Sequence, residues 1–191
     1  MVKDLREKTG AGVLDCKHAL EQSDGDMDKA LQWLREKGLA GAAKKASRTT
    51  GQGIVTSYIH PGSRVGVLVE LNCETDFVAR LDEFQALAHD IAMQVAAAKP
   101  EWLTPADVPA DVVERERDIY KVQAEAEGKP PKAVENIVEG RLKKFYAEFC
   151  LVEQAFIKNP DLAIKDLVSA KVLSTGENIK ISRYARFEIG K

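Results

Sequence analysis

The side chains best suited to catalysis are three histidines and three cysteines, and no catalytic or metal-binding spacing joins them. His60 lies beside a predicted turn, but the sequence gives no reason to place a carboxylate or a nucleophile near it. The other two histidines, His18 and His89, fall within predicted helices. The cysteines are odd in number and far apart, which favours reduced thiols over a disulfide framework: Cys16, Cys73 and Cys150. We therefore predict no catalytic residue, no metal site and no cofactor.

A polar turn that carries one large aromatic residue is the most distinctive stretch, and it consists of Thr75, Asp76, Phe77 and Val78. Residues 65–71 before it are β-branched and almost all apolar, as in a central buried strand. After it, apolar residues recur at intervals of three and four in the pattern of an amphipathic helix: Phe84, Leu87, Ala88, Ile91, Val95 and Ala98. From composition alone, Thr75 or Asp76 caps this helix and Phe77 packs under the sheet.

The residues around this turn resemble a known family. Residues 61–62 (PG), 64–80 (RVGVLVELNCETDFVAR) and 90–100 (DIAMQVAAAKP) are similar to bacterial elongation factor Ts, the guanine-nucleotide exchange factor of elongation factor Tu. Residues 138–148 (VEGRLKKFYAE) repeat another phrase of that family. The resemblance implies a partner-binding stretch at Thr75–Val78. In it, the phenylalanine intrudes near the partner's phosphate and magnesium site, displaces the ion, and is positioned with the help of Asp76.

Residues 1–39 are predicted to form three short helices of the ubiquitin-associated type. In the second helix the apolar positions are Leu14, Cys16, Ala19 and Leu20. Residues 5–20 (LREKTGAGVLDCKHAL) and 25–38 (GDMDKALQWLREKG) match the family's N-terminal module, which docks on elongation factor Tu. The resemblance carries over to Thr9, Gly10, Ala11, Gly12, Asp15, Cys16 and Lys17. One sequence does not separate the residues that touch the partner from those that make the turn. A structural cap on the main domain is the alternative interpretation of this module.

The predicted fold class is α+β, with three domains or segments: the module at 1–39, a linker at 40–53, and a core at 54–191. Three antiparallel strands (54–60, 65–71 and 179–189) are covered by helices, and residues 60–64 close a hairpin. Helices at 111–127 and 132–146 form an αα-hairpin, because Gly128, Pro130 and Pro131 interrupt them. Residues 162–168 are predicted to be a short helix.

Composition limits the function further. Of 191 residues 30% are charged, with a net charge of −2, so no basic field predicts direct binding of nucleic acid or of a membrane. Lys44, Lys45 and Arg48 are interpreted as a solvated face of the linker. The absence of a long apolar run or signal segment predicts a cytoplasmic protein.

Four interpretations are weighed. The resemblance implies a nucleotide-exchange factor without covalent chemistry, which binds GDP-bound and nucleotide-free elongation factor Tu. Because this chain resembles the family's short form, with a single core, we also expect a homodimer. The alternatives are a non-catalytic adaptor that uses the three-helix module, an enzyme built on Cys73 or Cys150, and an RNA-binding translation accessory.

Overall fold

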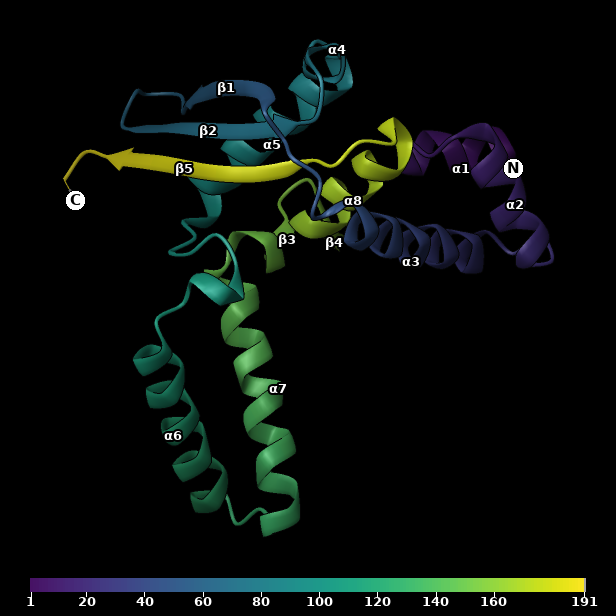
Figure 1. Cartoon of the computed structure of the whole chain (residues 1–191). Coiled ribbons are helices and arrows are strands. Elements are labelled where there is room, and N and C mark those ends of the chain that lie inside the picture. The colour runs from purple at the N-terminus through teal and green to yellow at the C-terminus, as the bar shows by residue number, and fades with distance from the viewer. Residues whose placement is uncertain (191) are drawn as a thin grey trace. The chain divides into compact units, whose positions relative to one another are not determined.

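The computed structural model describes residues 1–190, which form two compact units (Figure 1). The first unit contains Met1–Ala97 and the chain from Lys165 onward, and the second contains Ala98–Ile164. Each unit has its own helices and its own sheet. The fold class is α+β, as predicted.

The sheet of the first unit contains the three strands that the sequence predicts. They are β1 (Gln52–Ile59), β2 (Val65–Cys73) and β5 (Lys180–Glu188), antiparallel and in the order β1-β2-β5. The predicted hairpin turn is present, with the N–H of Ser63 donating to the carbonyl of His60 at 2.9 Å. The strand β2 is central, so its backbone is paired on both edges, and its buried apolar residues are those of one face, Val67, Val69 and Leu71.

One face of this sheet is covered by α5 (Asp82–Ala98). The helix is predicted correctly, and its apolar stripe is buried: Phe84, Leu87, Ala88, Ile91, Ala92 and Val95. On β2 the residues of the covered face are buried too, namely Val67, Val69, Leu71 and Cys73. Two contacts join α5 to the outer strands. The ring of Tyr58 packs edge-on against His89, and Arg186 donates to the carbonyl of Ala96.

The opposite face of the sheet is exposed and carries large apolar side chains. Cross-strand register places Ser57 opposite Leu68, and Leu68 opposite Ala185, on this face. Phe187 has 68% of its surface exposed. The other exposed apolar residues on these strands are Val55, Ile59 and Leu68. We call these four residues the open sheet face. A contiguous exposed apolar patch is a candidate interaction surface.

The N-terminal helices are α1 (Val2–Thr9), α2 (Val13–Gln22) and α3 (Met27–Lys45). They enclose a small core, on which Leu173 of α8 (Ile164–Thr175) also packs: Leu5, Ala11, Cys16, Ala19, Leu20, Ala30 and Leu34. The carboxylate of Asp26 caps α3 by accepting from the N–H groups of Asp28 and Lys29. An ion pair between Arg35 and the buried Asp166 also ties α3 to α8.

One expectation for this region is corrected. The third helix does not end within the predicted module at 1–39 but continues to Lys45, so residues 40–45 of the predicted linker are helical. Alanine and lysine are strong helix formers, and a single glycine in the interior lowers helix stability without ending the helix. Among the apolar positions named for the second helix, Cys16, Ala19 and Leu20 are buried in α2, whereas Leu14 is 80% exposed. The division into domains at 39 and 53 stays a prediction.

The second unit contains the predicted αα-hairpin, formed by α6 (Ala110–Ala126) and α7 (Pro131–Phe149). The helices pack through Ala124, Val134, Val138 and Leu142. Aromatic contacts at the other end of α7 join Trp102, Phe145 and Phe149. Short 3-10 turns at Pro105–Asp107 and Leu151–Glu153 complete the connections.

A two-stranded sheet in the second unit corrects another expectation. β3 (Ala155–Phe156) pairs with β4 (Asn159–Ala163). The helix expected at 162–168 therefore begins only at Ile164, and it runs on to Thr175. Pro160 gives β4 a poor strand sequence, but a two-stranded sheet has only edge strands, where proline is tolerated.

Replacing either of two glycines by alanine is expected to change the free energy of unfolding, in opposite directions at the two positions. A Cβ at Gly38 would meet the carbonyl oxygen of Ser169 at 3.5 Å, which is an ordinary contact. Gly38→Ala is therefore expected to raise the free energy of unfolding by about 0.5–1 kcal/mol, by removing a helix-interior glycine. At Gly53, φ is +148°, and a Cβ would overlap the carbonyl oxygen of Leu71 and the Cα of Asn72, so the backbone would have to shift. Gly53→Ala is expected to cost roughly 1–3 kcal/mol or more.

Urea denaturation of the two variants beside the parent chain measures both effects. Equal shifts of the same sign in the two variants would contradict this description of the close approach between β1 and β2.

Candidate functional site

The aromatic turn forms α4 (Asp76–Ala79), a single helical turn that follows β2 directly. Thr75 is its N-cap: its backbone is extended, and its hydroxyl oxygen accepts from the N–H of Val78 at 3.4 Å. Arg80 closes the turn by donating to the carboxylate of Asp76 at 2.6 Å. Thr75 therefore caps α4, and Asp76 braces it through Arg80. The capping interpretation is right about the role of Thr75 but wrong about the helix, because α5 begins separately at Asp82.

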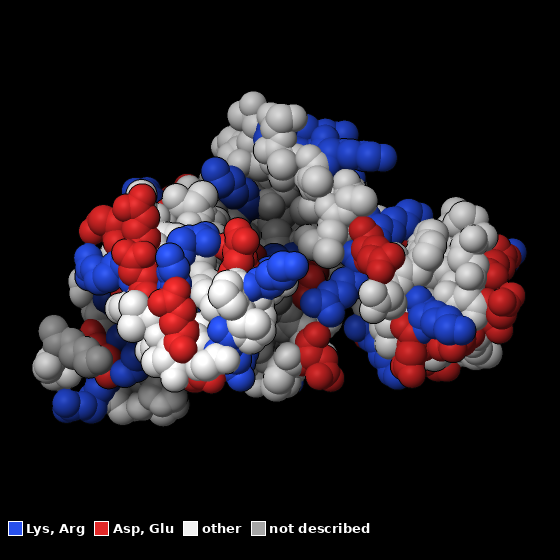
Figure 2. All heavy atoms as spheres, turned by 90° about the horizontal axis from the view of Figure 1, so that it is seen from below, with Lys and Arg blue, Asp and Glu red and all other residues white. Residues whose placement is uncertain are grey.

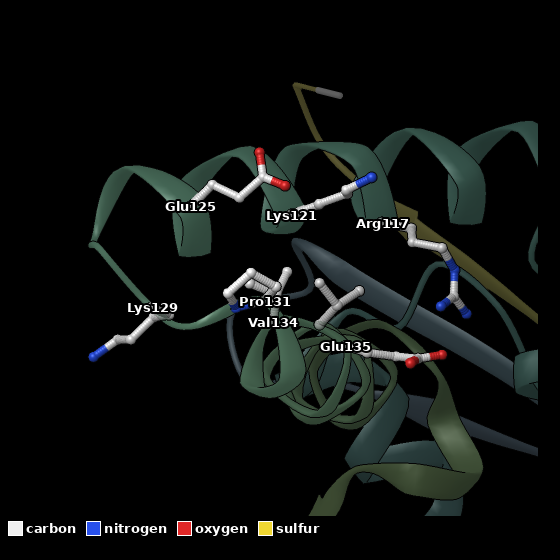
Figure 3. A pocket seen from close by; sticks show the side chains of 8 residues that line it. Arg117, Lys121, Glu125, Lys129, Pro131, Val134 and Glu135 are labelled. Carbon is white, nitrogen blue, oxygen red and sulfur yellow. The ribbon is translucent and has the colours of Figure 1, made fainter.

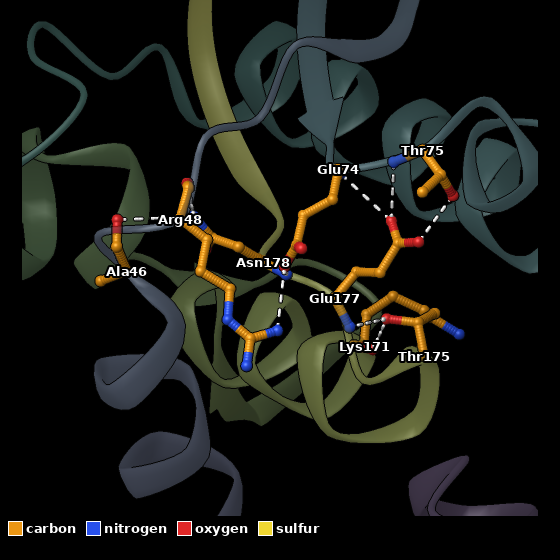
Figure 4. Close-up of polar contacts among 8 residues, drawn as sticks. All are labelled: Ala46, Arg48, Glu74, Thr75, Lys171, Thr175, Glu177 and Asn178. Carbon is orange, nitrogen blue, oxygen red and sulfur yellow. Dashed lines mark hydrogen bonds and ion pairs between the residues drawn. The ribbon is translucent and has the colours of Figure 1, made fainter.

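A carboxylate from the far end of the sequence holds the start of this turn. Glu177 accepts from the N–H of Glu74 at 3.1 Å, from the N–H of Thr75 at 3.0 Å and from the hydroxyl of Thr75 at 2.6 Å (Figure 4). Backbone N–H groups at a strand end need acceptors, and an ionised carboxylate makes stronger hydrogen bonds than a neutral group. Sequence reasoning missed Glu177, because no local pattern links it to residues 74–75.

The carboxylate of Glu74 makes the reciprocal contact, from the end of β2 to the turn that carries Glu177. Glu74 accepts from the N–H of Asn178 at 2.6 Å and from Arg48 at 3.4 Å. The hydrogen bond from the Asn178 backbone, followed by the contact with Arg48, holds the pKa of Glu74 below its usual value. The side-chain amide of Asn178 donates to the carbonyls of Arg48 and Ala46. We call Glu74, Glu177 and Asn178 the clasp, since they join the chain at residues 46–48, 74–75 and 177–178.

Phe77 projects from α4 into solvent, with 77% of its surface exposed. Its neighbours Val78 and Ala79 are buried and attach the turn to the protein. The expectation from composition that Phe77 packs under the sheet is therefore wrong. A large exposed aromatic on a backbone fixed at both ends has the form of a protein-binding anchor.

The predicted residues of the N-terminal module fall into two groups. Four of them make or support the turn between α1 and α2: Gly10 and Ala11 lie in the turn, Thr9 ends α1, and Cys16 lies in α2. Thr9 donates its hydroxyl to the carbonyl of Leu5 at 2.7 Å, Gly10 is left-handed with φ at +65°, and Ala11 and Cys16 are buried. Gly12 and Lys17 are exposed, and Asp15 pairs with Lys37 at 2.6 Å.

Sequence reasoning also missed two exposed apolar residues at the start of α2, Val13 and Leu14. Their signal was present as two adjacent apolar residues after Gly12, since consecutive helix positions do not share one face. No hydrogen bond or ion pair within residues 1–190 joins residues 9–17 to residues 75–78. The two predicted partner-binding stretches are therefore separate surfaces of the same unit.

The buried thiols are poorly placed for nucleophilic chemistry. Burial raises the pKa of Cys73, and its Sγ donates to the carbonyl of Thr75 at 3.1 Å. Burial also raises the pKa of Cys150 to about 11. A thiol with a raised pKa holds little thiolate at neutral pH. These environments disfavour the enzyme alternative built on Cys73 or Cys150.

The described residues contain no group of three or more His, Cys, Asp or Glu side chains that could hold a metal ion. None of the helices described combines the length and the apolar character needed to cross a membrane. On the face seen in Figure 2, acidic and basic side chains are interspersed. A surface hollow on the αα-hairpin likewise mixes both signs around an apolar floor (Figure 3). Its lining includes Arg117, Lys121, Glu125, Lys129, Pro131, Val134 and Glu135. No predicted site residue lies in this hollow.

The fold and the site define an α+β protein that carries an exposed aromatic on a fixed turn and, as a separate element, a small three-helix module. An exposed aromatic anchor of this kind is typical of a protein-binding factor. The sequence model of the family described as Elongation factor TS matches residues 19–191, and the chain belongs to the elongation factor Ts family.

Curated relatives align with the whole chain. The protein named elongation factor Ts of Carboxydothermus hydrogenoformans is 61% identical over 191 residues, which is 100% of this chain and 88% of that protein. The elongation factor Ts of Heliobacterium modesticaldum is 56% identical over 100% of this chain and 89% of its own length. That of Desulfosudis oleivorans is 53% identical over 100% and 96%.

The lowered pKa of Glu74 predicts a pH effect on stability. Because the folded pKa lies below the usual 4.5, Glu74 contributes stability that is present above pH 4.5 and is lost as the pH falls through the folded value. The urea midpoint of the parent chain should therefore fall more steeply below pH 4.5 than that of Glu74→Gln, which has no charge to lose. Parallel pH profiles of the two proteins would contradict this role of the ionised carboxylate.

Proposed function

We propose that this chain is a nucleotide-exchange factor that binds elongation factor Tu in its GDP-bound and nucleotide-free states and promotes replacement of GDP by GTP. The observation that carries the proposal is the exposure of Phe77 on a fixed turn, in a chain of the elongation factor Ts family. Phe77 inserts beside the partner's phosphate and magnesium site and displaces the ion. Thr75, Asp76 and Val78 hold the backbone that presents it.

The residue type suits this task. A phenylalanine has two rotatable side-chain bonds, so it loses little entropy when it inserts, and it brings a large apolar area. The exposed ring gains a favourable free energy only when a partner covers it. Factor and nucleotide then oppose each other, and each weakens the binding of the other by the same factor.

The free energy gained by burying one phenylalanine is too small for Phe77 to act alone. Burying a phenylalanine contributes roughly 1.5–3 kcal/mol, which corresponds to about one to two powers of ten in an equilibrium constant. Phosphate and Mg²⁺ contacts to GDP are charge-assisted and stronger in sum. A second surface must therefore contribute to the exchange complex, and we assign this role to the N-terminal module. Its exposed Gly12 and Lys17, together with Val13 and Leu14, supply polar and apolar contacts.

No step of this proposal involves covalent chemistry, a cofactor or nucleic acid. The protein accelerates the exchange of a ligand held by another protein. It acts where elongation factor Tu works, in the cytoplasm.

Release of fluorescent GDP from elongation factor Tu tests the proposal. The parent chain should accelerate release, and Phe77→Ala should slow the accelerated rate by about 10–100-fold, the size expected for one lost aromatic anchor. Val122→Ala is the control, because Val122 is 65% exposed on α6 of the other unit. It should leave the rate unchanged.

Two outcomes would contradict this proposal. Absence of acceleration by the parent chain would argue for the adaptor alternative, in which residues 1–39 bind a partner and Phe77 is silent. Acceleration that is insensitive to Phe77→Ala would remove the insertion mechanism.

We also propose that the chain forms a homodimer through the open sheet face. Val55, Ile59, Leu68 and Phe187 are exposed together on a rigid sheet, and a second copy offers the same apolar surface for a two-fold contact. Ile59, Leu68 and Phe187 also line a hollow at the hairpin end of the sheet, into which side chains of the second copy would pack.

Sedimentation velocity at micromolar concentration tests the dimer. The parent chain should sediment as a dimer and Phe187→Asp as a monomer, because a buried unpaired carboxylate is costly. Val122→Asp introduces the same charge at an exposed apolar position of α6 and should remain dimeric. A parent chain that sediments only as a monomer at micromolar concentration would overturn the proposed dimer.

A further inference from the structure

We propose that Glu177 is a positioning residue for nucleotide exchange, which fixes the start of α4 so that Phe77 is held ready for insertion. The inference rests on the proposed function and deepens it. Glu177 does not itself contact the partner's nucleotide in this proposal; it acts through Thr75 and the backbone of residues 74–75.

The hydrogen bonds of Glu177 place it at the point where β2 becomes α4. One oxygen, Oε2, accepts from the N–H groups of Glu74 and Thr75, and the other, Oε1, accepts from the hydroxyl of Thr75. The same hydroxyl oxygen accepts from the N–H of Val78. A continuous chain of hydrogen bonds therefore runs from Glu177 through Thr75 to Val78, the residue that follows Phe77. Figure 4 shows its first part, from Glu177 to Thr75.

Glu177 is itself fixed from its own side. Its backbone N–H donates to the hydroxyl oxygen of Thr175, the last residue of α8, at 3.3 Å. The hydroxyl of Thr175 in turn donates to the carbonyl of Lys171 at 2.8 Å. The next residue, Asn178, is buried and donates its N–H to Glu74. The carboxylate thus projects from a turn that is anchored to a helix, which makes it a rigid support for α4.

The need for such a support follows from the size of α4. One helical turn of four residues is not stable by itself, because helix nucleation is unfavourable. Without the clasp the turn would sample other conformations, and Phe77 would have to be ordered during insertion. Rigid presentation in the free protein removes that cost from the exchange step.

The clasp also connects the two proposed partner-binding surfaces. Asn178 holds the carbonyls of Ala46 and Arg48, which follow the end of α3. The chain that leaves the N-terminal module is therefore bound to the same turn that supports α4. Loss of Glu177 is expected to affect presentation of Phe77 more than docking of the module, because Asn178 keeps its own contacts.

The experiment compares Glu177→Ala and Glu177→Gln with the parent chain. Glutamine keeps the shape and one acceptor oxygen but loses the charge. Glu83→Gln is the matched control: Glu83 lies on α5, binds Lys171 of α8 at 2.9 Å, and makes none of the clasp contacts. GDP release from elongation factor Tu is measured over a range of factor concentrations, which separates the maximal rate from the half-saturating concentration.

Glu177→Ala is expected to lower the maximal release rate about tenfold, the size of one lost charge-assisted hydrogen bond. Its half-saturating concentration should change by less than about threefold, since the module still docks. Glu177→Gln should fall between Glu177→Ala and the parent, and Glu83→Gln should match the parent. In a Phe77→Ala background, Glu177→Ala should cause no further loss, because a positioning residue has nothing left to position.

Amide hydrogen exchange of the free chain provides a readout that does not depend on activity. The amides of Glu74 and Thr75 should exchange about tenfold or more faster in Glu177→Ala, while the urea midpoint and the remaining core amides stay close to those of the parent. Unchanged protection at residues 74–75 would overturn the proposal. So would an unchanged release rate, or a full additional loss in the Phe77→Ala background.

Failure of this inference is distinguishable from failure of the proposed function. If the parent chain does not accelerate GDP release, the exchange function itself is overturned, and with it the positioning role. If the parent is active and Glu177→Ala is equally active despite loosened amides, only the positioning role is overturned.

Discussion

The hydrogen bonds from the backbone N–H groups of Glu74 and Thr75 to the carboxylate of Glu177 are the interaction on which the site depends. They fall where β2 has ended and α4 has not yet formed its own hydrogen bonds, so these donors have no partner in either element. An acceptor from the distant turn at residues 175–178 satisfies them. The direction in which Phe77 leaves the protein therefore depends on residues about a hundred positions away as well as on the contacts within its own turn.

The turn at residues 175–178 also holds other parts of the first unit together. β5 follows the clasp directly, so the strand that completes the sheet and the carboxylate that supports α4 are placed by one segment. Glu74 and Asn178 reciprocate this contact and add the end of α3 to it. The buried side chains of β2 and α5 provide hydrophobic stabilisation. The clasp contributes charge-assisted hydrogen bonds, which fix the geometry of the chain and bury little apolar surface. This division explains how a strongly exposed aromatic is tolerated on an otherwise ordinary α+β core.

Much of this fold could be predicted because burial leaves a periodic signal. The apolar residues of β2 and the stripe of α5 report their neighbours directly, and the capping role of Thr75 follows from its type. Periodicity does not report the exposure of Phe77, since a four-residue turn is too short to define a face. Glu177 was unpredictable because its partners are 102 and 103 residues away. The short sheet of β3 and β4 was missed because Pro160 and Asp161 are poor strand residues. Apolar character alone does not report burial, since α2 leaves Leu14 exposed.

Phe77 is exposed in the free protein, and we propose that it becomes buried against elongation factor Tu. A fluorinated phenylalanine placed at position 77 reports this directly by fluorine NMR, with a soluble paramagnetic agent as the probe of exposure. We expect strong broadening by the agent in the free chain and protection, with a changed chemical shift, once elongation factor Tu is saturating. Equal sensitivity to the agent in the free chain and in the saturated complex would contradict it.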